Sequence, residues 1–70
     1  MQYTVIIEKG ATSWGTYVPD LPGCIAGDTR DEAVALIREA IEFHVEGLIE
    51  QGATVPEPHS FSELIQVNAS

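Results

Sequence analysis

The chain has 70 residues, 44% of them hydrophobic, and its 11 acidic residues outnumber three basic ones, for a formal net charge of −8. A chain this short forms one domain, here residues 1–70, and buries only about 60% of the surface that its unfolded state exposes, so we expect a partner or self-association to help stabilise it. Three scattered basic residues cannot supply the clustered phosphate contacts of a nucleic-acid-binding protein. A basic protein is the more natural partner for a chain with this negative charge. Alternatively, the acidic residues serve solubility alone.

The single cysteine, Cys24, permits no disulfide within the chain, and a reducing cytoplasmic location is the default for such a sequence. No apolar run approaches the roughly 18 residues of a membrane span. The first residues enter a strand pattern directly, without the charged and apolar regions of a signal peptide. We therefore expect a soluble, cytoplasmic protein.

The first half of the chain predicts three antiparallel strands. Residues 3–8 are rich in β-branched and aromatic side chains, with Tyr3, Val5 and Ile7 on one face and Ile6 on the other. A loop leads to a second strand at residues 14–18, and a tight turn leads to a third at residues 24–26. Residues 64–67 also have strand composition and predict a fourth strand that returns to the sheet, with residues 68–70 fraying.

Residues 18–29 carry dense turn signals between the second strand and a helix. Pro22 and Gly23 suit the central pair of a type II turn, in which Gly23 takes a positive φ. Thr29 and Glu32 have the spacing of a capping box. We assign a structural role in the turn and cap to eight residues: Pro19, Asp20, Pro22, Gly23, Gly27, Asp28, Thr29 and Glu32.

Residues 30–50 predict one amphipathic helix. Its apolar positions recur at about 100° per residue and form a single stripe: Ala33, Val34, Ile37, Ala40, Ile41, His44 and Leu48. Gln51 and Gly52 predict a left-handed C-terminal cap, and Gly47 suggests a close backbone approach. The expected fold is α+β, in the order β-β-β-α-β, a small and mostly antiparallel sheet with one long helix on one face.

The opposite face of the predicted helix is acidic. It carries like charges four residues apart, which is locally unfavourable, and we regard these residues as candidates for partner binding: Asp31, Glu39, Glu42, Glu46 and Glu50. The sheet face without a helix and the shoulder of the apolar stripe offer candidate oligomer or partner anchors: Ile6, Trp14, Leu36 and Phe43. Leu36 and Phe43 could instead complete the core.

The residues with chemical potential do not form a recognisable catalytic or metal site. Neither His44 nor His59 has cysteine or carboxylate neighbours at ligand spacing, so we expect a packed histidine and an exposed one. Asp20 and Asp28 could form a carboxylate pair, but hydrogen bonds to their own turns explain them more simply. Cys24 resembles a small buried hydrophobe. We predict no catalytic residue, no metal and no cofactor.

Several segments together resemble a known family: Tyr17-Val18-Pro19-Asp20-Leu21-Pro22-Gly23-Cys24, Gly27-Asp28-Thr29, Glu32-Ala33, Glu39-Ala40, Pro56 and Pro58. They are similar to the HicB family of antitoxins, and the resemblance covers nearly the whole chain. It implies a partial RNase H-like fold without the nuclease activity of that fold. It also implies a type II toxin–antitoxin system, in which the protein covers the catalytic surface of a small, basic, mRNA-cleaving HicA-type toxin.

Members of that family often carry a C-terminal helix-turn-helix or ribbon-helix-helix segment that binds operator DNA. This chain departs from that pattern a few residues after the predicted fourth strand, so we expect no DNA binding of its own. We expect a dimer or tetramer. One alternative is an orphan oligomeric scaffold or regulator without a toxin partner. Another is a small-ligand or enzyme domain that uses Asp20, Asp28 and Cys24.

Overall fold

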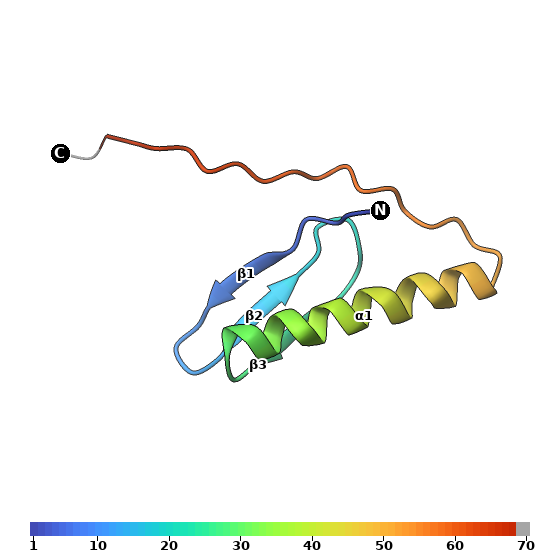
Figure 1. The fold of residues 1–70 in the computed structure, drawn as a ribbon, viewed down its shortest axis with the longest axis horizontal. Coiled ribbons are helices and arrows are strands. Elements are labelled where there is room, and N and C mark those ends of the chain that lie inside the picture. Colours follow the sequence, from blue (N-terminus) through green and yellow to red (C-terminus); the bar gives the residue numbers. More distant parts are fainter. Residues whose placement is uncertain (69–70) are drawn as a thin grey trace.

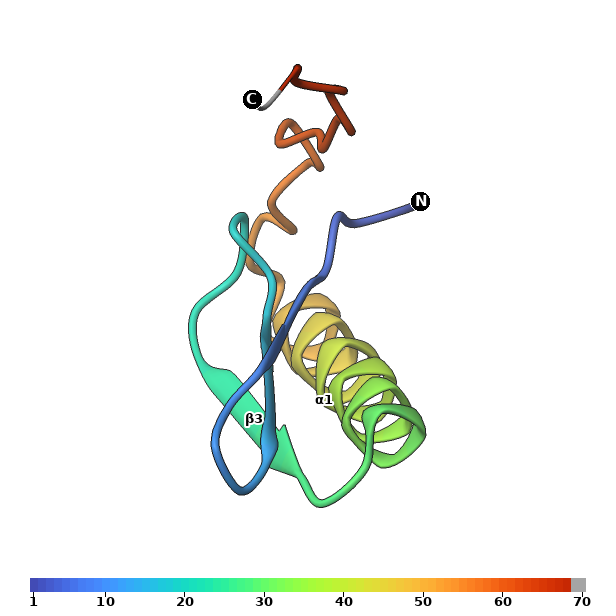
Figure 2. The ribbon, with the colours of Figure 1, turned by 90° about the vertical axis from the view of Figure 1, so that its left-hand side faces the viewer.

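The structure, a computed structural model, describes residues 1–68 and contains a small sheet covered by one helix (Figure 1). Strands β1 (Ile6–Lys9), β2 (Trp14–Tyr17) and β3 (Cys24–Gly27) are followed by helix α1 (Arg30–Glu50). The strands pair antiparallel in the order β1-β2-β3, and α1 lies against one face of the sheet (Figure 2). The predicted α+β class, three-stranded meander and helix are therefore confirmed.

The strand register places alternate rows of side chains on opposite faces of the sheet. Thr16 pairs with Ile7 and Ile25, and its side chain is buried beneath α1. The next row consists of Ile6, Tyr17 and Cys24. Since successive side chains in a strand alternate in direction, this second row lies on the face that α1 does not cover.

Cys24 is exposed, so the expectation of a buried cysteine is wrong. Its place in β3 follows from the register, because the neighbouring Ile25 takes the position that faces the helix. A short strand with only one covered face cannot bury two consecutive residues equally.

The core consists of Val18, Leu21 and Ile37, with Ala33 fully buried beside them. Partly buried hydrophobic residues pack against it: Tyr3, Val5, Ile25 and Ile41. The predicted apolar stripe of α1 thus faces the sheet. Two of the three central residues, Val18 and Leu21, belong to the connection between β2 and β3, so this connection contributes directly to the core.

Gly23 and the start of the helix have the predicted geometry. Gly23 has a φ of 96°, a left-handed conformation that favours glycine. The hydrogen-bonded turn lies just before it, where the backbone N–H of Leu21 donates to the carbonyl of Val18 at 3.1 Å. Thr29 is the N-cap, and its side chain accepts a hydrogen bond from the Glu32 N–H at 3.1 Å. Glu32 in turn accepts from the N–H of Asp28 at 3.3 Å.

The helix ends in a Schellman motif. Gly52 has a φ of 69° and donates to the carbonyl of Ile49, while Ala53 donates to the carbonyl of Leu48 at 2.9 Å. The left-handed cap predicted from Gln51 and Gly52 is confirmed. Among the described residues, no heavy atom lies within 4 Å of a Cβ built on Gly47, so the expected close backbone approach at that residue is wrong for this part of the chain.

Residues 51–68 cross the molecule as an extended segment (Figure 1). The fourth strand predicted at residues 64–67 is wrong for the single chain, because this stretch pairs with no strand among the described residues. Its β-branched and apolar composition favours an extended backbone, but a ladder also requires a neighbouring edge within hydrogen-bonding distance. The fraying predicted for the last residues concerns Ala69 and Ser70, which lie outside the described residues.

Candidate functional site

The acidic face of α1 is continuous and exposed. At about 100° per residue its five carboxylates fall in one sector of the helix, on the side away from the sheet, and each of them is exposed: Asp31, Glu39, Glu42, Glu46 and Glu50. Over residues 1–68 no lysine or arginine lies within ion-pair distance of them. The five carboxylates are therefore presented to solvent without an ion pair to a basic side chain among the described residues.

An exposed aromatic side chain borders this acidic face. Phe43 is 80% exposed and lies one helical turn from Glu39 and from Glu46. Leu36, two turns before Phe43, is 36% exposed. Phe43 therefore does not complete the core, and the helix offers an apolar group with carboxylates on two sides.

The other two candidate anchors lie elsewhere and are less exposed. Ile6 belongs to the uncovered face of the sheet and is half-buried, as is Trp14 at the start of β2. The Lys9 ammonium lies 5.9 Å from the centroid of the Trp14 ring, within the range of a cation–π contact. The structure thus does not combine the four predicted anchors into one surface. Only Leu36 and Phe43 adjoin the acidic face.

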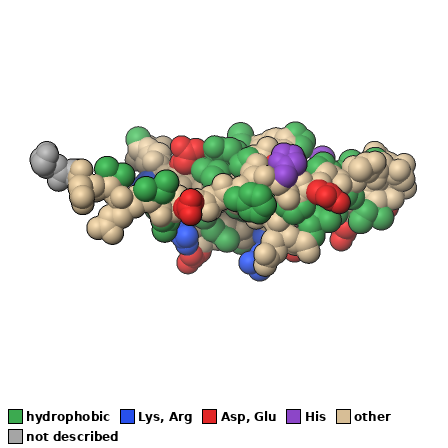
Figure 3. All heavy atoms as spheres, turned by 90° about the horizontal axis from the view of Figure 1, so that it is seen from above, with side chains coloured by type: hydrophobic (Ala, Val, Ile, Leu, Met, Phe, Trp, Pro, Cys, Tyr) green, Lys and Arg blue, Asp and Glu red, His purple; other side chains and the backbone are tan. Residues whose placement is uncertain are grey.

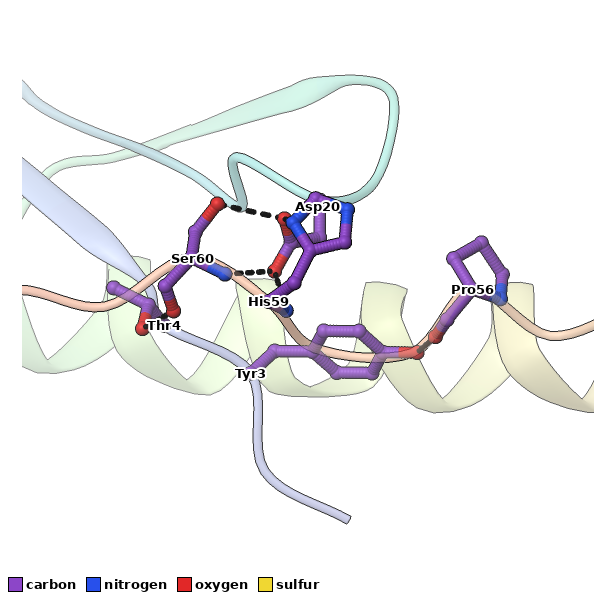
Figure 4. A network of polar contacts seen from close by, with 6 residues as sticks. All are labelled: Tyr3, Thr4, Asp20, Pro56, His59 and Ser60. Atoms are coloured by element: carbon purple, nitrogen blue, oxygen red, sulfur yellow. Dashed lines mark hydrogen bonds and ion pairs between the residues drawn. The ribbon is translucent and has the colours of Figure 1, made fainter.

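A second polar cluster joins the turn after β2 to the segment that follows the helix (Figure 4). One carboxylate oxygen of Asp20, Oδ2, accepts the backbone N–H groups of His59 and Ser60, both at 3.1 Å. The other oxygen, Oδ1, accepts the Ser60 hydroxyl at 2.7 Å and lies 3.0 Å from Nδ1 of His59. The Asp20 side chain is only 1% exposed, whereas that of His59 is 81% exposed.

These contacts correct the prediction that Asp20 serves its own turn. Its partners lie 39 and 40 residues away in the sequence, and no local signal could identify them. The Ser60 hydroxyl lowers the pKa of Asp20, with smaller contributions from the two backbone N–H groups and from the charge of His59, while burial opposes them. The carboxylate is therefore held in its ionised form as the anchor of the segment.

The Asp20 cluster does not have the arrangement of a nucleophilic triad. In a triad the histidine receives the proton of the serine, whereas here Ser60 donates to the carboxylate itself. Two further contacts hold the same segment: the Tyr3 hydroxyl donates to the carbonyl of Pro56, and the Thr4 hydroxyl donates to the carbonyl of Ser60 at 2.7 Å. The cluster ties residues 56–60 to the body of the domain.

The remaining candidate residues are not brought together into a site. Asp28 lies at the start of α1 with Glu32, whereas Asp20 binds His59 and Ser60. His44 is half-buried beside a hollow of about 30 Å³, as expected for a packed histidine. In residues 1–68 no three histidine, cysteine or acidic side chains gather where they could hold a metal ion. No helix in this part of the chain has both the length and the apolar character needed to cross a membrane.

Comparison with known proteins identifies relatives along almost the whole chain. The family described as "HicB_like antitoxin of bacterial toxin-antitoxin system" matches residues 3–69. Antitoxin HicB 2 of Photorhabdus laumondii is 33% identical over 100% of this chain and 52% of its own length. A 14.9 kDa protein from the rep-hol intergenic region of Haemophilus phage HP1 is 41% identical over 93% of this chain and 50% of its own length.

The chain spans about half the length of these two relatives. A UPF0150 protein of Thermoplasma acidophilum, in contrast, is 39% identical over 99% of this chain and 100% of its own length. No solved structure matches the chain at a significant level.

Proposed function

Because the chain belongs to the family of HicB-like antitoxins, we propose that it binds and occludes a basic, HicA-type, mRNA-cleaving toxin and that the acidic face of α1 makes this contact. One observation supports the choice of this face as the toxin-binding surface. Phe43 is 80% exposed between carboxylates that have no basic partner among the described residues.

Charge and apolar contact have different roles in this interface. Complementary charge raises the association rate and selects the partner, whereas buried aromatic or aliphatic anchors provide most of the affinity. Phe43 and Leu36 are the anchors, and the five carboxylates beside them steer a basic surface into place. The chain catalyses no reaction, and inhibition results from covering the surface at which the toxin binds and cleaves RNA. We place this inhibition in the cytoplasm, where such a toxin meets its mRNA substrate.

Co-expression with a small basic protein encoded in the adjacent reading frame tests the function. Growth arrest by that protein should be relieved, and the two chains should purify as a complex. Absence of both the complex and the relief would contradict the antitoxin assignment. A second candidate, an orphan oligomeric scaffold, is supported by the exposed apolar side chains of residues 61–67, and it predicts self-assembly with no such partner.

Charge reversal tests the surface. In the Glu42→Lys/Glu46→Lys variant we expect association at low salt to slow by about tenfold or more. The matched control, Glu8→Lys/Glu57→Lys, changes the net charge equally at exposed positions away from α1. Equal association rates for the two variants, measured by stopped-flow fluorescence, would show that the acidic face is not the contact.

Truncation of the exposed ring tests the anchor. The Phe43→Ala variant should dissociate from the toxin about 10- to 100-fold faster, since loss of a central aromatic anchor typically costs about 1.4–2.8 kcal/mol. Its thermal unfolding should be unchanged, because the ring contributes little to the core. A dissociation rate equal to that of the parent would exclude Phe43 from the interface.

A further inference from the structure

An unfilled groove lies beside the free edge of β1. Its volume is about 740 Å³, and its floor is formed by Val5 and Ile7 on one side and by Val34, Ile37 and Ile41 of α1 on the other. Because β1 is the first strand in the order β1-β2-β3, only one of its edges is paired. The edge next to the groove leaves backbone N–H and C=O groups free to accept another strand.

The same chain carries an apolar extended segment that nothing covers. Phe61, Leu64, Ile65 and Val67 are 75% to 102% exposed. This segment leaves the body of the domain at one end (Figure 1), and in the view of Figure 3 its hydrophobic side chains are seen beyond the globular part. A row of large apolar side chains on an extended backbone is typical of a strand that pairs with another surface.

The chain's own contacts hold this segment only up to Ser60. Asp20 and Thr4 bind Ser60 through its N–H, hydroxyl and carbonyl groups, and no hydrogen bond ties residues 61–68 to the body of the domain. The groove and the segment are therefore both present in each copy, and both are unused. In a dimer, the segment of each copy can occupy the groove of the other copy. A two-fold axis between the copies would fill both grooves at once.

Alternation along the extended backbone defines which side chains would enter the groove. Phe61 lines the end of the groove, so Glu63, Ile65 and Val67 share its side of the segment, while Leu64 and Gln66 face the other way. Arg38 also lines the groove. Arg38 supplies a positive charge where Glu63, the one acidic residue of the segment, would be placed, and Glu42 supplies a negative charge in the same groove.

We propose that residues 61–68 of one copy add as a strand to the free edge of β1 in a second copy, with Ile65 and Val67 over the groove, and that the exchange is reciprocal. The result is a dimer in which each sheet gains a fourth strand from its partner. This assembly uses the free edge of β1 and the groove, and it meets the acidic face of α1 at Glu42, which also lines the groove. The other four carboxylates of that face are not among the groove's lining residues.

Light scattering of the full chain should show a dimer or a larger even-numbered assembly. In the Ile65→Asp/Val67→Asp variant, the dissociation constant should rise by roughly 100-fold or more, as expected for two apolar side chains that lose their burial. The control Ser62→Asp/Gln66→Asp adds the same charge on the other side of the segment and should remain assembled. Because all four positions are exposed in the single chain, both variants should fold, which circular dichroism would verify.

Isotope-filtered nuclear Overhauser spectra of mixed labelled and unlabelled chains distinguish exchange from docking onto the chain's own groove. Contacts between the Ile65 methyl groups of one copy and Ile7 or Ile41 of another would establish the exchange. A monomeric parent chain, contacts found only within one chain, or an Ile65→Asp/Val67→Asp variant as well assembled as the control would each overturn it.

Discussion

Replacing Gly27 by alanine should destabilise the domain, because no space exists for the added methyl group. A Cβ at this position would lie 2.7 Å from the backbone nitrogen of Ala33, 3.0 Å from its Cα and 3.2 Å from its Cβ. These atoms belong to the first turn of α1, so they cannot rotate away as the end of a long side chain could. Either β3 or the start of the helix has to move.

Overpacking of this kind costs about 1–3 kcal/mol. For a domain of 60–100 residues, each kcal/mol shifts the melting temperature by roughly 4–8 °C, so the Gly27→Ala variant should melt about 4 to 24 °C lower than the parent. Backbone strain is not the cause, because Gly27 does not have a positive φ. The expected loss arises from the approach of β3 to α1 alone.

Thermal unfolding followed by circular dichroism at a fixed protein concentration measures the effect. Gly15→Ala is the matched control, since no atom of residues 1–68 lies within 4 Å of a Cβ at that position in β2. It should change stability by less than about 1 kcal/mol. If Gly27→Ala and Gly15→Ala unfold at the same temperature, the close approach of Gly27 to Ala33 does not exist as described.

Two further predictions concern buried polar groups. The Thr16 hydroxyl is buried without a hydrogen-bond partner in the described part of the chain, so Thr16→Val should raise the free energy of unfolding by about 1 kcal/mol in urea titrations; a loss of stability would indicate that the hydroxyl has a partner. The pKa of Asp20 is lowered from 3.8, so its contribution to stability is present above that value and is lost as the pH falls through the lower, folded-state pKa. The protection factor of the Ser60 amide, its intrinsic exchange rate divided by the observed one, should fall over that acidic range, and in Asp20→Asn it should already be low at neutral pH. An unchanged protection factor in the variant would show that Asp20 does not hold the segment.

The Asp20 cluster and the proposed strand exchange are compatible. The cluster fixes the point at which residues 61–68 leave the body, since Ser60 is bound through three of its polar groups. A fixed departure point limits the directions that the free segment can sample, which reduces the entropy lost when it pairs. Protonation of Asp20 in acid should release Ser60 and should therefore also weaken the dimer.

The acidic face illustrates how far the sequence determined the candidate site. Periodicity alone placed the five carboxylates on one side of α1, and they are exposed there. It could not decide whether Phe43 joins the core or faces solvent, because a residue on the shoulder of an apolar stripe is buried only if the sheet extends beneath it. The three strands are too few and too short to reach it.

By itself, the sequence determined the meander, the helix from Arg30 to Glu50 and both of its caps. These features depend on residues within a few positions of one another: the Pro22-Gly23 turn, the pairing of Thr29 with Glu32, and the left-handed Gly52. Only the tertiary structure decided that Asp20 holds Ser60 and that residues 61–68 remain unpaired. Both outcomes depend on which groups come into contact across a sequence separation of about 40 or more residues. The packing of the whole domain determines such contacts, and local conformational preference does not.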